Sequence, residues 1–143
     1  MVLGTTLIVV LRYALNEGSI LLQEAVLYLH AVVFMLGIPY TLKADGHVRV
    51  DLVYSRLGPR ARTVIDLIGH VLFLLPVAGV LLLYSQSYVA RSWRILEGSS
   101  EVGGIPGVFL LKTLIPVLAV LLVLQGLAEI ARGIRTLRDA RRD

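Results

Sequence analysis

Five side chains with ionisable or metal-ligating chemistry lie within or beside long apolar runs of the sequence. Three are charged (Glu24, Asp66 and Lys112) and two are imidazoles (His30 and His70). A carboxylate in an apolar segment could couple to a proton or cation, as Glu24 would do in a small self-assembling exporter. However, the charged residues fall near the ends of their runs. Snorkelling to an interface or an ion pair between helices therefore explains them more economically.

The two histidines raise the possibility of a haem with two axial ligands. Their runs cross in opposite directions, so at about 1.5 Å per residue His30 lies roughly 18 Å, and His70 roughly 9 Å, from the same end of the bundle. Because both ligands of one haem must meet at the same iron, we interpret both residues as hydrogen-bonded histidines of a helix bundle. We predict no cofactor, and a haem- or quinone-binding membrane anchor of a redox enzyme is the alternative function.

Segment 45–57 is the most informative connection between the apolar runs. Its apolar residues recur at i, i+3, i+4 and i+7: Val50, Val53, Tyr54 and Leu57. Two polar pairs are spaced i, i+4: Asp45 with Arg49, and His47 with Asp51. The pattern predicts a short amphipathic helix at the membrane interface, which either anchors the loop among lipid headgroups or docks a partner subunit. A catalytic His–Asp pair is disfavoured because no nucleophile or closed pocket accompanies it.

Composition sets the class of fold that carries these residues. The chain has 143 residues, 57% hydrophobic and 17% charged, with a mean hydropathy of +0.80, whereas soluble domains are about 25% charged. About 20 apolar residues span a bilayer, so the chain could hold at most four spans. We predict an all-α, polytopic membrane bundle of four helices in one domain, 1–143. The absence of cysteine excludes disulfides, thiol catalysis and iron–sulfur clusters.

Helices are predicted at 1–12, 20–42, 64–90 and 108–130, followed by a basic cytoplasmic tail at 131–143. The first is partial, because a run of about 16 Å crosses only half a bilayer. We therefore expect Met1 to be an internal methionine or a misassigned start, with the helix beginning upstream. The local signals are a cap at Ser19 or Asn16, Pro59 in a first helical turn after Gly58, a kink at Pro76 and a turn-rich loop at 97–107.

The basic residues predict the orientation. The connection between the second and third runs and the C-terminal tail together hold ten Lys and Arg, against three or four on the other side. This bias predicts that the central connection and the C-terminus are cytoplasmic. The positive charge is then a topology signal rather than a nucleic-acid-binding surface.

Residues 40–51 resemble the small permease subunit, the DctQ-like family, of tripartite ATP-independent periplasmic (TRAP) transporters. The resemblance rests on a basic residue followed by Gly-His-(Ile/Val)-Arg-Val-Asp, and it extends over nearly the whole chain, through Ser92-Trp93-Arg94 and the Gly-Gly-Ile-Pro loop. The family-motif residues that it marks as a partner interface are Lys43, Asp45, Gly46, His47, Arg49, Val50, Asp51, Trp93, Gly104, Pro106, Lys112 and Pro116.

The resemblance implies a non-catalytic, four-helix protein of the bacterial inner membrane with both termini in the cytoplasm. Such a subunit braces a large elevator-type permease subunit, to which a periplasmic binding protein delivers an organic acid. An ion gradient, usually of sodium, drives uptake, and membrane lipid surrounds both subunits. One departure lies at Leu22-Gln23-Glu24, where family members often carry a Trp and two acids and this chain offers one acid.

Overall fold

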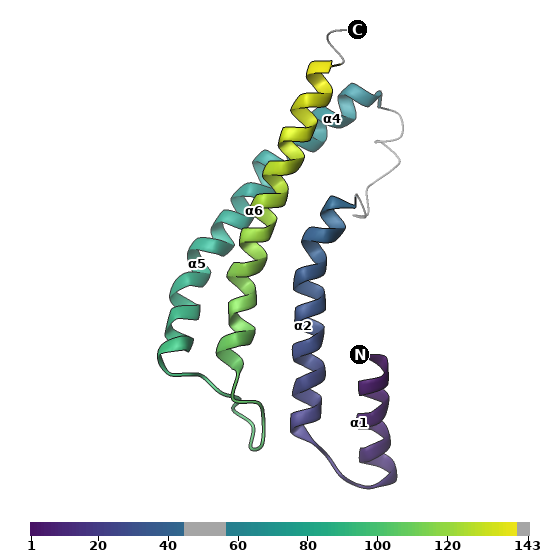
Figure 1. Ribbon diagram of the computed structural model, residues 1–143, viewed down its shortest axis with the longest axis vertical. Helices are drawn as coiled ribbons and strands as arrows, with labels where there is room; N and C mark the ends of the chain where they lie inside the picture. The colour runs from purple at the N-terminus through teal and green to yellow at the C-terminus, as the bar shows by residue number, and fades with distance from the viewer. Residues whose placement is uncertain (45–56, 140–143) are drawn as a thin grey trace.

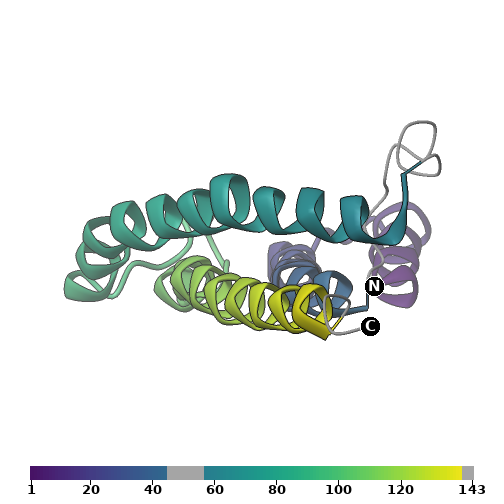
Figure 2. The same ribbon diagram turned by 90° about the horizontal axis from the view of Figure 1, so that it is seen from above.

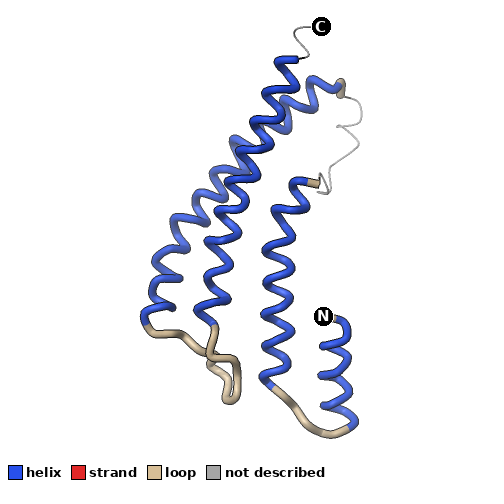
Figure 3. Tube along the Cα trace, in the orientation of Figure 1, coloured by secondary structure: helices blue, strands red, loops and turns tan. Residues whose placement is uncertain are grey.

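The computed structural model describes residues 1–44 and 57–139. Apart from short connections these residues are helical, which confirms the predicted all-α class (Figures 1 and 3). The elements are α1 (Val2–Ala14), α2 (Ile20–Lys43), α4 (Pro59–Gly69), the π-helical segment η1 (His70–Leu74), α5 (Leu75–Arg94) and α6 (Val108–Asp139). The interfacial helix predicted at 45–57 lies outside the described residues, except for Leu57.

The long helices stand side by side in a row, in the order α5, α6, α2, α1 (Figure 1). Contacts join α5 to α6, α6 to α2, and α2 to α1. Viewed from above, α4, η1 and α5 form one continuous rod beside α6 (Figure 2), and all three parts of this rod contact α6. The described part of the chain is therefore a row of helices in which the rod of α4, η1 and α5 crosses α6.

Three helical stretches are long and apolar enough to cross a membrane: Ile20–Lys43, Pro59–Arg94 and Val108–Asp139. The shorter apolar helix α1 runs beside only part of α2 (Figure 1). Many large apolar side chains point outward, as at Leu83 and Phe73, which are 73% and 69% exposed. Such outward apolar surface suits lipid or another membrane protein, and the chain is a multi-pass membrane protein.

Small side chains allow α5 and α6 to approach closely. The buried residues at their contact are Ala78, Ser85, Val89 and Ser92 on α5, and Ala119, Leu122 and Gly126 on α6. A Cβ atom added at Gly126 would lie 2.9 Å from Cδ2 of Leu74, the last residue of η1, and 3.4 Å from Cδ2 of Leu75, the first residue of α5. Close approach through small residues is the usual packing of membrane helices, because lipid supplies no hydrophobic force to press helices together.

Two helix starts confirm predictions from local sequence. Ser19 caps α2, where its Oγ accepts a hydrogen bond from the Leu22 N–H at 3.3 Å. Gly58 is the N-cap of α4, and Pro59 occupies the first turn. N–H groups in the first turn have no partner within the helix, so the absence of an N–H on proline costs no hydrogen bond there.

Three boundaries differ from the predicted ones by four residues or more. The third helical stretch begins at Pro59, where the Gly58–Pro59 signal predicts a helix start, rather than at 64, where the predicted helix began, and it ends at Arg94 rather than 90. A kink was predicted at Pro76 in this stretch, and the structure instead has a π-helical turn, η1, directly before that proline. In this turn the Leu75 N–H bonds to the His70 carbonyl. Helix α6 runs to Asp139 rather than ending at 130, because its last turns pack against α4.

Candidate functional site

The connection between α5 and α6 is fastened to the first turns of α2 by one carboxylate. Glu24 accepts a hydrogen bond from the Ser99 hydroxyl on Oε1 and one from the Ile105 N–H, at 2.6 Å, on Oε2. The Ser99 N–H in turn bonds to the Ile105 carbonyl at 3.1 Å, so the two donors are held together. We call this group, Glu24 with Ser99 and Ile105, the Glu24 clasp. It joins residues 75 and 81 positions apart in the sequence.

A second carboxylate fastens the same loop to α6. Lys112 Nζ lies 2.5 Å from Glu97 Oε2, which also accepts a hydrogen bond from the Ser92 hydroxyl at 2.6 Å. The ammonium of Lys112 also sits 4.2 Å from the ring centroid of Tyr88, in a cation–π contact. We call Ser92, Glu97 and Lys112 the Lys112 clasp. The partner of Lys112 thus comes from the loop rather than from another spanning helix.

The electrostatics of the Lys112 clasp keep Glu97 charged. The hydrogen bond from Lys112 lowers the pKa of the Glu97 carboxyl, and the Ser92 hydroxyl lowers it further. Partial desolvation acts in the opposite direction but is outweighed. The ion pair therefore persists throughout the neutral range.

Four of the sequence-predicted residues gather around this loop: Trp93, Gly104, Pro106 and Lys112. Trp93 does more than face an interface, since its Nε1–H donates to Thr113 Oγ1 at 2.9 Å, and its ring meets Phe109 edge-on with centroids 4.8 Å apart. A Cβ at Gly104 would lie 2.5 Å from Ser99 Cβ and 2.8 Å from Glu24 Oε1. Only glycine fits beside the Glu24 clasp without displacing it.

Pro106 and Pro116 shape the chain on either side of the start of α6. A Cβ at Gly98 would lie 3.3 Å from Pro106 Cα, so the outgoing and returning segments of the loop approach closely there. Pro116 lies inside α6, where its missing N–H removes the helical bond to the carbonyl of Lys112.

The two histidines have separate local partners. His30 Nδ1 lies 3.1 Å from Met1 Sδ and its ring stacks on Phe34. His70 Nδ1 lies 2.6 Å from the Asp66 carbonyl oxygen. Among the described residues, no group of three or more His, Asp or Glu side chains is placed to hold a metal ion.

The remaining predicted residues lie away from the loop. Lys43 is the last residue of α2, at the opposite end of the molecule from the two clasps. Several motif residues lie outside the described part of the chain: Asp45, Gly46, His47, Arg49, Val50 and Asp51.

Sequence reasoning missed Ser92, Glu97 and Ser99, which supply the clasps with Glu24 and Lys112. Glu97 and Ser99 were interpreted only as part of the predicted turn-rich loop. Ser92 was not singled out, because attention fell on the neighbouring Trp93. The sequence did offer one signal that could have identified these residues: the loop carries two acidic residues, which lie between basic residues and near serines. Chemically, the carboxylates of Glu24 and Glu97 accept hydrogen bonds that fix the loop in place, which is a positioning role rather than a catalytic one.

Comparison with protein families gives a match over most of the chain. The family model described as "Tripartite ATP-independent periplasmic transporters, DctQ component" matches residues 1–136, which include both clasps, the first two spanning stretches and all but the last three residues of the third. No curated protein and no solved structure matches the chain. The resemblance drawn from residues 40–51 is confirmed.

Proposed function

The chain belongs to the DctQ component family of tripartite ATP-independent periplasmic transporters, and from this membership we propose that it braces the large permease subunit of such a transporter. It is a small transporter subunit of the membrane, in a family of transport components rather than of enzymes. In the proposal, the large subunit carries the substrate and ion sites. Uptake of an organic acid, delivered by a periplasmic binding protein, is driven by an ion gradient.

The arrangement of the helices in a row carries this proposal. A path for a solvated anion needs polar groups facing a space enclosed between helices. In the described residues each long helix contacts its neighbours in the row, and the carboxylate of Glu24 is engaged by the loop. The exposed flanks are mainly apolar. A row of helices of this kind is suited to widening and steadying a partner's fixed scaffold against the movement of its transport domain.

The basic residues support an orientation with the C-terminus in the cytoplasm. The end of α2, the start of α4 and the end of α6 lie at one end of the molecule (Figure 1). The described basic residues of these segments are Lys43, Arg60, Arg62, Arg132, Arg135 and Arg138. By the positive-inside rule this end is cytoplasmic. The loop that carries the clasps then faces the periplasm, with Val102 at its tip 93% exposed, where a binding protein could reach it.

Co-purification together with uptake tests the proposal. An affinity-tagged chain expressed with its neighbouring reading frames should retain a much larger membrane protein through detergent extraction. Deleting the chain should abolish uptake of the transported organic acid while the large subunit stays in the membrane. The proposal is overturned if the chain elutes as a monodisperse monomer and uptake of every candidate acid survives its deletion.

A Glu24→Gln variant separates bracing from coupling. The amide keeps one hydrogen-bond acceptor oxygen for the loop but cannot exchange a proton in the way a carboxylate does. Bracing requires that uptake driven by the ion gradient persists, with a gradient dependence equal to that of the wild type. Loss of gradient coupling with the large subunit still bound would instead place the coupling group in this chain.

A further inference from the structure

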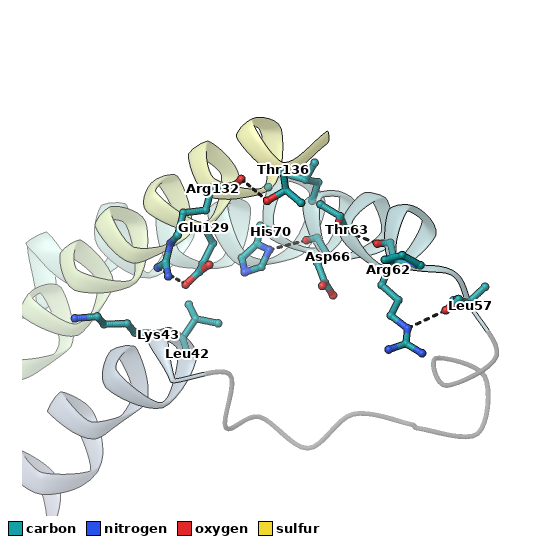
Figure 4. Close-up of a pocket in the computed structure, with 13 residues that line it drawn as sticks. Leu42, Lys43, Leu57, Arg62, Thr63, Asp66, His70, Glu129, Arg132 and Thr136 are labelled. Carbon is teal, nitrogen blue, oxygen red and sulfur yellow. Dashed lines mark hydrogen bonds and ion pairs between the residues drawn. The ribbon is translucent and has the colours of Figure 1, made fainter. Parts of the chain in front are cut away.

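A cavity of about 610 Å³ lies at the end of the molecule opposite to the clasps, where the end of α2, the rod of α4 and η1, and the last turns of α6 converge (Figure 4). Its apolar lining includes Leu42, Leu57 and Leu67. Its charged lining comprises three basic residues and two acids: Lys43, Arg62, Arg132, Asp66 and Glu129. Apolar walls and charges therefore share one concave site, which the proposed function does not use.

The balance of charge among the described residues that line the cavity is positive. Glu129 accepts hydrogen bonds from Arg132 Nη2 at 2.6 Å and from Gln125 Nε2 at 2.9 Å, so its charge is matched locally. That contact uses one N–H group of the Arg132 guanidinium, which carries five. The Lys43 ammonium makes no hydrogen bond or ion pair with the described residues. Among the described lining residues there are three cations and two carboxylates, and this formal excess favours an anionic ligand.

The height of the cavity favours a lipid over a soluble anion. Lys43 ends one spanning helix and Pro59 begins the next, so the cavity lies at the level of a membrane interface. From there the lipid-facing side of α4 continues into the membrane with Ile65 and Ile68, which are 45% and 48% exposed. A phospholipid presents its phosphodiester and the first carbons of its acyl chains at this depth, matching the cations and the apolar wall respectively.

We propose that this cavity binds the phosphodiester of one anionic phospholipid from the surrounding leaflet, with Lys43 and Arg132 as its charge partners. The leucines of the wall pack against the glycerol and the upper acyl chain. The proposal concerns the full chain in its membrane and holds in either orientation of the protein. It adds a specific ligand to a subunit whose proposed role is bracing. The bound lipid would contact the ends of α2, α4 and α6 together and so connect them.

Native mass spectrometry of the detergent-purified full chain, titrated with phosphatidylglycerol, tests the site. Lys43→Gln should lower phosphatidylglycerol occupancy about fivefold, the effect of one basic residue near anionic lipid. Thr136→Phe, which fills the cavity without changing charge, should lower it at least as much. Arg135→Gln is the matched control, because it removes one exposed positive charge from the end of α6, outside the cavity lining, and it should leave occupancy unchanged.

The competing ligands give the remaining arms. Phosphatidylcholine should bind no better to the wild type than to Lys43→Gln, and inorganic phosphate should not displace phosphatidylglycerol. Displacement by inorganic phosphate would identify a site for a free anion instead. An equal loss with Arg135→Gln would reduce the effect to general surface charge, and unchanged occupancy with Thr136→Phe would remove the cavity from the explanation. Helix content by circular dichroism should be the same for all variants.

Discussion

Gly104→Ala places one methyl group against the Glu24 clasp and tests whether the clasp holds the loop on α2. The added Cβ would lie 2.5 Å from Ser99 Cβ, an atom fixed to the backbone, and 2.8 Å from Glu24 Oε1. Neither contact is tolerable, so Ser99 or Glu24 must move and their hydrogen bond must open. Overpacking of this kind lowers the free energy of unfolding by about 1–3 kcal/mol.

The chain offers a matched control and its own probe. Gly107→Ala is the same substitution in the same loop, where the new Cβ would meet its nearest atom, Ile105 Cγ2, at an ordinary 3.4 Å. The single tryptophan, Trp93, donates a hydrogen bond to Thr113 beside the loop. Its fluorescence during thermal unfolding in detergent therefore reports on the end of the molecule that carries the α5–α6 loop. Gly104→Ala should lower the midpoint by several degrees, while Gly107→Ala should stay close to the wild type. Equal midpoints for the two variants would refute the reasoning.

Three further outcomes follow from the described contacts. The pKa of Glu97 is lowered in the folded chain, so its ion pair with Lys112 stabilises the fold at pH values above the unfolded carboxyl pKa, and this stability is lost as the pH falls through the lower folded pKa. The thermal unfolding temperature should therefore decrease once the pH is lowered below about 4.3. Glu97→Gln should make the unfolding temperature less dependent on pH in that range. Ala78→Leu should destabilise the chain by about 1–3 kcal/mol in detergent unfolding because Ala78 is fully buried against α6, whereas Gly79→Ala, with no atom within 4 Å of the new Cβ, should not destabilise it. Ser19→Ala should cost about 1 kcal/mol in the same assay through loss of the α2 cap, and an unchanged midpoint would contradict that role.

The fold was predictable from the sequence where the signals are local. Ser19 and Pro59 mark helix starts by chemistry that acts within one turn, and the apolar runs identify spanning helices because the bilayer fixes their length. The π-turn before Pro76 was predictable only as a disturbance, since a proline shows that a helical bond is missing but not where the backbone absorbs the change. The extension of α6 to Asp139 depends on contact with α4, which the composition of a basic tail does not reveal.

The site was less predictable because its contacts are distant in sequence. Glu24, Lys112 and Trp93 attracted attention as polar or aromatic groups at apolar boundaries, and the resemblance marked Gly104. Nothing in those features pairs Glu24 with a hydroxyl 75 residues later. Ile105 contributes a backbone N–H, and a main-chain donor carries no signature of residue type at all. Tertiary placement of the loop on α2 determines both partners.

The sequence separation within the Glu24 clasp also sets an order of events during synthesis. At about 5–20 residues per second, the ribosome takes about 4–15 s to travel from Glu24 to Ser99. Through that interval α2 is already made while both donors for its carboxylate are still missing. Glu24 lies in the second turn of α2, about 6 Å from the helix start, so water at the membrane surface can solvate it meanwhile. The arrival of the loop then replaces that water and marks the moment when α2 is joined to the α5–α6 hairpin.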